Sequence, residues 1–247
     1  MLAKGLQVLQ YLVEHPEHES GVSDVARALG LPVSTAHRLL GTLLATDWVS
    51  RAPHSSSYRL GPQVLNAAET LRSNLGLTDM HGVLADLATR VSETVILGTL
   101  IGGQFIYLDV VHGPGLLGIQ GSVGRRGALH STATGKALLC ALPTERRNAL
   151  IDELELTRLT PSTITDREAL RAEIERSLER GYTRTDEENE AGVTSIGIPI
   201  RIEQDPDGVY AVCIAAPTQR ASSRVESFHA ALVQARTLLR TAGVSPR

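Results

Sequence analysis

The amino-acid sequence predicts an α+β protein with a small helical domain at the N-terminus and a larger domain of strands and helices after it. Apolar residues recur at helical spacing through the first 45 residues. After residue 92, β-rich runs joined by Gly102-Gly103 predict an antiparallel hairpin. The 247 residues also exceed the roughly 100 to 150 that are usual for one domain, so two domains are expected.

The composition is that of a soluble globular protein, with 42% hydrophobic and 21% charged residues. Cys140 and Cys213 lie within apolar runs, which favours buried, reduced thiols. The N-terminus lacks the pattern of a signal peptide, and no apolar run approaches the about 18 to 20 residues of a membrane span. We therefore expect a cytoplasmic protein with no membrane partner.

The N-terminal residues follow a helix-turn-helix pattern. A first helix over 2–14 ends at His15-Pro16. In the stretch 22–44, Ser23 is the expected N-cap of a second helix, Gly30 can take the left-handed conformation that ends it, and Pro32 forbids its continuation. Two helices separated by so short a turn are typical of a motif in which the second helix enters the major groove of DNA.

The third helix has an apolar face at 3.6-residue spacing, and its other face is polar or small. The apolar positions are Ala36, Leu39, Leu40, Leu43 and Leu44. Hydroxyl groups reach phosphates or base edges, and arginine binds guanine or phosphate in a bidentate manner. The predicted DNA contacts on this helix are Ser34, Thr35, His37, Arg38 and Thr42. An ordinary helical hairpin with a solvated polar face is the alternative.

Residues 49–60 read as two short strands around a serine-rich tip, which is the form of a wing beside a recognition helix. The predicted backbone or minor-groove contacts are Arg51, His54, Ser56 and Arg59. A purely structural hairpin is the alternative. Residues 1–61 hold five basic and five acidic side chains. Because few phosphate contacts give weak binding by one copy, we expect a dimer or a larger oligomer on DNA.

Gly61-Pro62 marks a boundary, since proline suits the first position of a helix. The helix that follows carries an apolar stripe and breaks at Gly76; the stripe is Val64, Leu65, Ala68, Leu71 and Leu75. Such a stripe must pack on something, which favours a linker helix that contributes to dimerisation. The expected division is 1–61, 62–77 and 78–247.

The second half alternates helices with strands. Helices are expected at 80–91, 134–141, 144–150, 166–180 and 225–242. Strands are expected in the two runs around Gly102-Gly103 and at 116–120, 182–185, 196–202 and 209–215. Antiparallel hairpins with helices packed outside them make an α+β domain.

The run GRRGALHSTATGKALL, residues 124–139, is distinctive but is not a Walker A loop, because His130 and Ala137 occupy its two ends. A serine- and threonine-rich turn that opens a helix at Thr134 leaves free N–H groups, which favour an anion such as a carboxylate. Simple N-capping by Thr132 or Thr134 is the alternative.

Catalytic and metal chemistry find little support. Ser131, Ser195, His130 and Asp186 could supply a hydrolase triad, but no G-x-S-x-G elbow orders them. The acidic run 186–190 lacks histidine or cysteine ligands nearby and is better read as a solvated turn. We expect no catalytic residue, no metal and no cofactor.

The whole chain resembles the IclR family of bacterial transcriptional regulators. The resemblance is carried by LGLPVSTAHRLLGTL and YRLGPQVL, then by VGRRGALHSTATGKALLCALP, TPSTITD, RGYTRTDEENEAGVTSIGIPI and IAAPTQR. It implies a winged helix-turn-helix, a linker helix and a GAF-like effector-binding domain. It also implies a regulator, read here as a repressor, that binds an operator in double-stranded DNA as a homodimer or a dimer of dimers.

The resemblance further implies an effector pocket around the HSTATGKA turn and the facing sheet. The residues that fall on it are Leu116, Ile119, Gly127, Ala133, Thr134, Thr185 or Asp186, Ser195, Cys213 and Ala215. Members that bind small oxo-acids tend to have hydroxyls at the last two positions, so a larger or more apolar carboxylate is expected here. The competing classes are a small-molecule enzyme and a protein-interaction module with a decayed winged helix.

Overall fold

The computed structural model describes residues 1–247 except 17–19, 54, 76, 115–122, 204 and 242–247. Contacts divide the chain into two compact units, Met1–Ser73 and Asn74–Arg247. Each unit has its own hydrophobic core, and each is described by itself.

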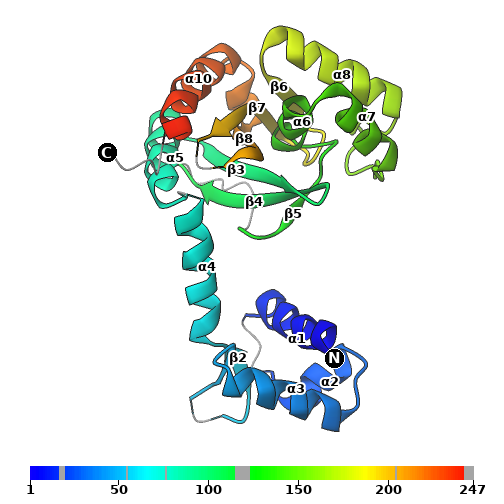
Figure 1. Ribbon diagram of the computed structural model, residues 1–247. Coiled ribbons are helices and arrows are strands. Elements are labelled where there is room, and N and C mark those ends of the chain that lie inside the picture. The colour runs from blue at the N-terminus through cyan, green and yellow to red at the C-terminus, as the bar shows by residue number, and fades with distance from the viewer. Residues whose placement is uncertain (17–19, 54, 76, 115–122, 204, 242–247) are drawn as a thin grey trace. The chain divides into compact units, whose positions relative to one another are not determined.

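The core of the first unit is formed, within its described residues, by three helices and a two-stranded sheet; a fourth helix, described below, follows them. The elements are α1 (Leu2–Glu14), α2 (Val22–Ala28), α3 (Val33–Ala45), β1 (Val49–Arg51) and β2 (Tyr58–Leu60) (Figure 1). Their core includes Val8, Leu12, Val25, Ala36, Leu40, Val49 and Tyr58. The amphipathic helices close on one another through this core, because their apolar faces lie at the predicted positions.

The start of α2 differs from the sequence prediction. Gly21 is the N-cap, and its N–H donates to Asp24 Oδ2 at 3.0 Å. Ser23 lies inside the helix, so its predicted role as the cap was wrong. The carboxylate of Asp24, in the first turn of the helix, accepts the hydrogen bond from the backbone N–H of Gly21. No serine or threonine hydroxyl is then needed as a cap.

Helix α4 (Pro62–Asn74) follows β2, and none of its residues is buried. Its stripe leaves Leu65 73% and Leu71 54% exposed. Leu65 and Leu71 are therefore largely uncovered, whereas Leu75, the last residue of the predicted stripe, lies beyond α4 and packs against the core of the second unit.

The second unit is built on an antiparallel sheet with helices on both faces. The strand order across its described residues is β5-β4-β3-β8-β7-β6. The strands are β3 (Thr94–Ile101), β4 (Gln104–Val111), β5 (Arg126–Gly127), β6 (Thr183–Asp186), β7 (Val193–Ile202) and β8 (Asp205–Pro217). The α+β class predicted from the sequence is confirmed.

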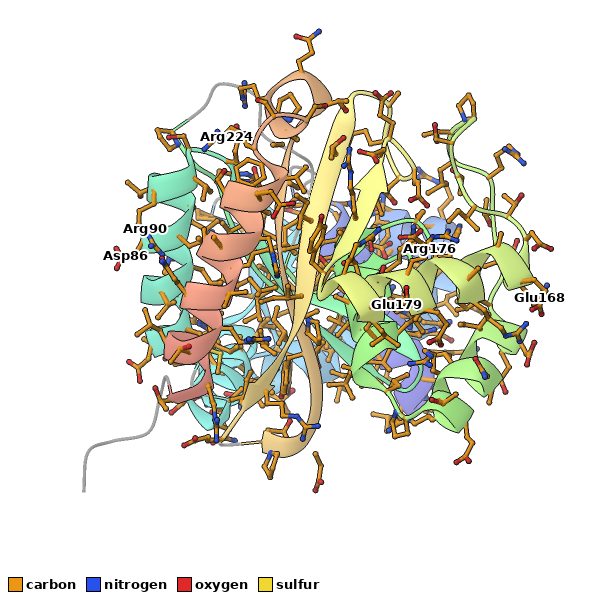
Figure 2. The ribbon with its side chains drawn as sticks, turned by 90° about the horizontal axis from the view of Figure 1, so that it is seen from above. Asp86, Arg90, Glu168, Arg176, Glu179 and Arg224 are labelled. Carbon is orange, nitrogen blue, oxygen red and sulfur yellow. The ribbon has the colours of Figure 1, made fainter. Side chains whose placement is uncertain are left out.

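Helices α5 (Leu77–Val91) and α10 (Val225–Thr241) pack on one face of this sheet. Helices α6 (Ala133–Ala141), α7 (Thr144–Glu153) and α8 (Arg167–Arg180) lie on the other. Figure 2 shows the two layers, with α5 and α10 on one side of the long strands and α8 on the opposite side. A short helix, α9 (Thr218–Ala221), follows β8.

The predicted helices and strands of the second unit are found, with ends that differ by a few residues. The strand expected at 116–120 lies outside the described residues. One feature was not predicted: the pairing of β3 with β4 shifts between Leu97 and Gly98, so that Leu108 is an extra residue on β4. Such a β-bulge changes which face of the sheet the following side chains occupy.

Candidate DNA-binding surface and ligand pocket

The polar side of α3 faces solvent. Gly30 adopts φ 60 between α2 and α3, as the turn requires. Ala36, Leu39 and Leu40 are buried on the core side of α3. Of the predicted DNA contacts on the helix, Thr35 is half-buried and four are exposed: Ser34, His37, Arg38 and Thr42. The helix therefore presents an open row of small hydroxyls, an imidazole and one guanidinium group.

The β1–β2 hairpin holds its two arginines on different faces. Arg51 pairs with Tyr58 across the strands, and its guanidinium lies 5.1 Å from the centre of that ring. Arg59 pairs with Ser50, and its Nε donates to Ser50 Oγ at 3.2 Å. Because side chains alternate along a strand, each face of the hairpin carries one arginine: Arg51 on one face and Arg59 on the other.

The remaining predicted residues of the hairpin lie at its tip. Ser56 is exposed. His54 lies outside the described residues.

A pocket in the second unit lies between the sheet and the N-terminal end of α6. It offers about 30 Å³ to the centre of a water-sized sphere, and it is open to solvent. Its described lining is Ile96, Tyr107, Thr132, Ala133, Thr134, Thr185, Asn189, Glu190, Val193, Ser195, Cys213 and Ala215. Five strands, β4, β3, β8, β7 and β6, thus contribute side chains to one concave surface.

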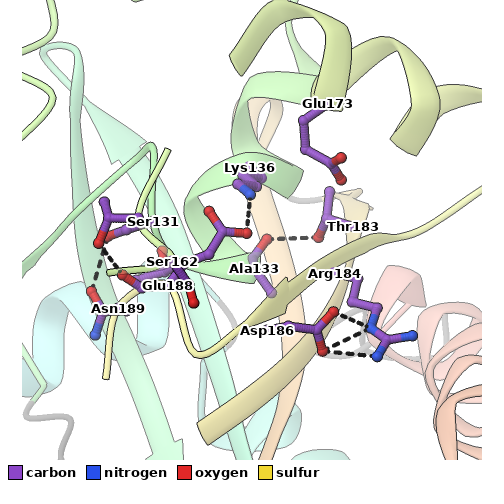
Figure 3. Close-up of polar contacts among 12 residues, drawn as sticks. Ser131, Ala133, Lys136, Ser162, Glu173, Thr183, Arg184, Asp186, Glu188 and Asn189 are labelled. Carbon is purple, nitrogen blue, oxygen red and sulfur yellow. Dashed lines mark hydrogen bonds and ion pairs between the residues drawn. The ribbon is translucent and has the colours of Figure 1, made fainter. Parts of the chain in front are cut away.

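Close packing brings α6 against the sheet. The Thr132 hydroxyl caps the helix, accepting from Gly135 N at 3.0 Å. A Cβ on Gly135 would lie 2.5 Å from Ala128 O, so glycine is required where the loop passes the helix. Thr183 Oγ1 donates to Ala133 O at 2.8 Å, which ties the first turn of α6 to β6 (Figure 3).

The inner end of the pocket is neutral. Thr134 Oγ1 donates to Cys213 Sγ at 2.9 Å. Burial raises the pKa of the Cys213 thiol to about 11 and, with a contribution from that thiol, raises the pKa of Tyr107 to about 12. Both groups stay protonated near neutral pH and act as uncharged hydrogen-bonding groups.

Three hydroxyls that line the pocket have no hydrogen-bond partner among the described residues. They belong to Tyr107, Thr185 and Ser195. Thr185 is 3% exposed, so its hydroxyl faces the pocket rather than bulk solvent. Tyr107 and Ser195 are half-buried, so these hydroxyls can be reached from the pocket and can hydrogen bond to a polar ligand.

A buried ion pair holds the segment that carries Asn189 and Glu190. Lys136 Nζ lies 2.6 Å from Glu188 Oε1, and the lysine side chain is 0% exposed (Figure 3). Burial lowers the pKa of Lys136 and raises the pKa of Glu188. Ser131 Oγ also donates to Asn189 Oδ1 at 3.1 Å. These contacts hold the segment 188–190, which forms one wall of the pocket, against α6 and against Ser131, just before that helix.

The structure brings together six residues that the sequence placed at an effector site: Ala133, Thr134, Thr185, Ser195, Cys213 and Ala215. Gly127 does not line the pocket, since it lies against the Phe105 ring, where an added Cβ would be 2.3 Å from it. Asp186 points away and binds Arg184 and Thr194, so Thr185 occupies the pocket position. Leu116 and Ile119 lie outside the described residues.

The lining residues that were not predicted are Ile96, Tyr107, Thr132, Asn189, Glu190 and Val193. Alternation along the two strands joined by Gly102-Gly103 could have suggested Ile96 and Tyr107. Asn189 and Glu190 come from the acidic run that was interpreted as a solvated turn, and both are exposed at the pocket.

Of the four residues considered for a hydrolase, His130, Ser131 and Asp186 are engaged elsewhere, and Ser195 lines the pocket apart from them. A ring nitrogen of His130 lies 3.0 Å from Thr157 O, and Ser131 binds Asn189. Within the described part of the chain, no group of three or more His, Cys, Asp or Glu residues could hold a metal ion. In the same part, no helix is long and apolar enough to span a membrane.

A winged helix-turn-helix unit joined in one chain to a unit with a pocket lined by hydroxyls is typical of a ligand-responsive DNA-binding transcriptional regulator. The chain matches the helix-turn-helix domain of IclR over residues 1–53 and the C-terminal domain of the bacterial transcriptional regulator IclR over residues 70–238. It belongs to the IclR family.

Its relatives are named as transcriptional regulators, which points to DNA binding rather than to an enzyme. The chain is 33% identical to the regulator Rv1719 of Mycobacterium tuberculosis over 94% of its length and 88% of that protein. It is 30% identical to the repressor AllR of Escherichia coli over 89% of its length and 80% of that protein.

A solved structure of similar fold contains a ligand. It is an IclR homologue from Microbacterium hydrocarbonoxydans complexed with 4-hydroxybenzoate, with a TM-score of 0.76 and 27% identity. The match covers 96% of this chain and 99% of that one.

Proposed function

We propose that this chain represses transcription from an operator that it binds as a dimer or a dimer of dimers, and that a small carboxylate-bearing metabolite alters this binding. Residues 1–61 bind DNA, residues 62–77 link and pair the subunits, and residues 78–247 bind the effector. The main support is one pocket that combines uncharged hydroxyls with the first turn of α6. The name of the relative AllR as a repressor supports the direction of the response.

On the DNA side, the exposed groups of α3 read the major groove and the hairpin contacts the backbone. The reading set is Ser34, Thr35, His37, Arg38, Thr42, Arg51, His54, Ser56 and Arg59. Arg38 is exposed, and its side chain makes no hydrogen bond or ion pair with the other described residues. Its guanidinium group is therefore available to DNA at no cost to the fold.

Oligomerisation follows from two observations. The first 61 residues have balanced charge, so one copy holds DNA weakly. Leu65 and Leu71 on α4 are more than half exposed, and a second copy of the helix would cover them. Pairing the subunits doubles the number of phosphate contacts.

The effector is a carboxylate with an apolar body. The N–H groups of the first turn of α6 and the dipole of that helix favour an anion. Cys213 and Ala215 place a thiol and a methyl group where hydroxyls would favour a small oxo-acid, and Ile96 adds further apolar surface. The aromatic acid in the related structure is consistent with a ligand of this kind.

Two variants test the two halves of this proposal. Arg38→Ala should abolish operator binding in a gel shift while the melting temperature stays unchanged. Thr134→Val should leave operator binding without ligand intact and weaken the response to acids, because it removes a hydroxyl beside Cys213. Thermal shift across small oxo-acids and aromatic acids identifies the class. Stabilisation by glyoxylate or pyruvate alone would overturn the apolar assignment.

A further inference from the structure

The three sheet hydroxyls of the pocket share one face of the sheet but lie toward its two opposite edges. Thr185 pairs with Ser195 across β6 and β7, so their hydroxyls stand next to each other. Ser195 pairs with Ala215 on β8, and Ile96 on β3 pairs with Cys213 on the same strand. Tyr107 comes from β4, on the far side of β3. An apolar strip therefore separates the hydroxyl pair on β6 and β7 from the strand that carries the tyrosine.

The ring of Tyr107 packs in a space that two glycines leave open. It packs on Phe105 with the ring centres 4.5 Å apart. An added Cβ would lie 2.3 Å from Phe105 at either Gly98 or Gly127, so two glycines make the space for this ring pair. The Phe105 ring therefore borders one side of the Tyr107 side chain, whose other side contributes to the pocket.

We propose that Tyr107 determines specificity by hydrogen bonding to a second oxygen of the effector, across the apolar strip from the hydroxyls of Thr185 and Ser195. The preferred ligand is then an acid with an apolar middle and a hydroxyl or carbonyl oxygen at its far end. This inference depends on the proposed effector site, since it assigns the orientation of a ligand in that site.

The uncharged state of Tyr107 favours this role over binding of a carboxylate by charge. Its phenol stays protonated because burial raises its pKa to about 12. A neutral hydroxyl can donate to a carbonyl or accept from a hydroxyl. An acid without the second oxygen would displace water from the Tyr107 hydroxyl without replacing its hydrogen bond, and the site would select against that acid.

Matched pairs of acids provide the test. We would titrate the full chain by calorimetry with benzoate and 4-hydroxybenzoate, and with pentanoate and 5-hydroxypentanoate. The wild type should bind the oxygenated member of at least one pair about tenfold more tightly, which corresponds to about 1.4 kcal/mol, the size of one net hydrogen bond. Tyr107→Phe should reduce the ratio to about twofold or less without weakening the member that lacks the second oxygen.

The control is Tyr182→Phe, since Tyr182 packs against His229 and does not line the pocket. Tyr182→Phe should keep the wild-type ratio of affinities for the two members of each pair of acids. A ratio near one in the wild type, or a tenfold ratio that survives in Tyr107→Phe, would overturn the role of Tyr107 and leave the effector site in place. If none of the acids binds the wild type at millimolar concentration, the proposed carboxylate effector is wrong and this inference falls with it.

Discussion

The buried pair of Lys136 and Glu188 offers a sharp test of how this domain is stabilised. At 2.6 Å and an effective dielectric constant near 20, the attraction between the charges is roughly 6 kcal/mol. Removing each ion from water costs several kcal/mol, so the two effects nearly cancel. The pKa directions agree, because burial outweighs attraction for both groups: the pKa of Lys136 is lowered and that of Glu188 is raised.

Replacing one residue of the pair should therefore lower the free energy of unfolding far more than replacing both. Glu188→Met leaves an ammonium group in a site that is 0% exposed, and it should lower the free energy of unfolding by about 3 to 5 kcal/mol. Lys136→Met should cost less, because Glu188 can take up a proton. The double variant should lie within about 1 kcal/mol of the wild type, since two methionines fill a similar volume without charge.

Urea unfolding of the four proteins measures the coupling between the two positions. The Glu188→Met melting temperature should fall by about 6 to 20 °C for a unit of this size. Arg240 and Glu203 supply a control cycle, since these partners are 66% and 43% exposed and should couple by less than about 1 kcal/mol. A double variant as unstable as the sum of the single variants would refute the reasoning.

Two further predictions concern packing and pH. Gly135→Ala should destabilise the second unit by about 1 to 3 kcal/mol in urea unfolding, because its Cβ would lie 2.5 Å from Ala128 O. Gly82→Ala on α5, with no atom within 4 Å of the added Cβ, should instead stabilise by up to about 1 kcal/mol, and equal effects would contradict the packing argument. Burial raises the pKa of Cys140 and of Cys213 to about 11, so both thiols favour the folded state below pH 9 and this contribution falls as the pH rises toward 11. Cys213 is buried and Cys140 partly buried, so iodoacetamide should label the native protein slowly at pH 7, Cys140 first, and the urea-unfolded protein rapidly; rapid labelling of Cys213 in both states would exclude its burial.

The elements that were predicted well are those whose signals are local. Gly30 and Pro32 mark the turn between α2 and α3, and the apolar period of α3 gives its buried face without knowledge of the fold. Asp24 shows the limit of such signals. Its carboxylate sits one turn inside the helix and satisfies Gly21, so the hydroxyl of Ser23 was the wrong cap to choose.

The pocket was predicted only in part because long-range contacts decide its walls. The residues near the first turn of α6 could be placed by resemblance. Asn189 and Glu190 could not, because an acidic run reads as solvated, and a contact with Lys136, far away in sequence, holds it at the pocket. The burial of an ion pair such as Lys136 and Glu188 cannot be predicted from the periodic spacing of apolar residues in the sequence.

The bulge in β4 separates the roles of Tyr107 and Asp109. Leu108 and Asp109 together oppose Leu97, so the alternation of faces breaks directly after Tyr107. The tyrosine keeps the pocket face, while Asp109 turns to the opposite layer and binds His81 Nδ1 on α5 at 2.7 Å. Two polar residues that strict alternation would place on one face thus serve different layers of the domain. Asp109, although it is close to the pocket in sequence, belongs to the packing of α5, and a ligand-binding role for β4 rests on Tyr107.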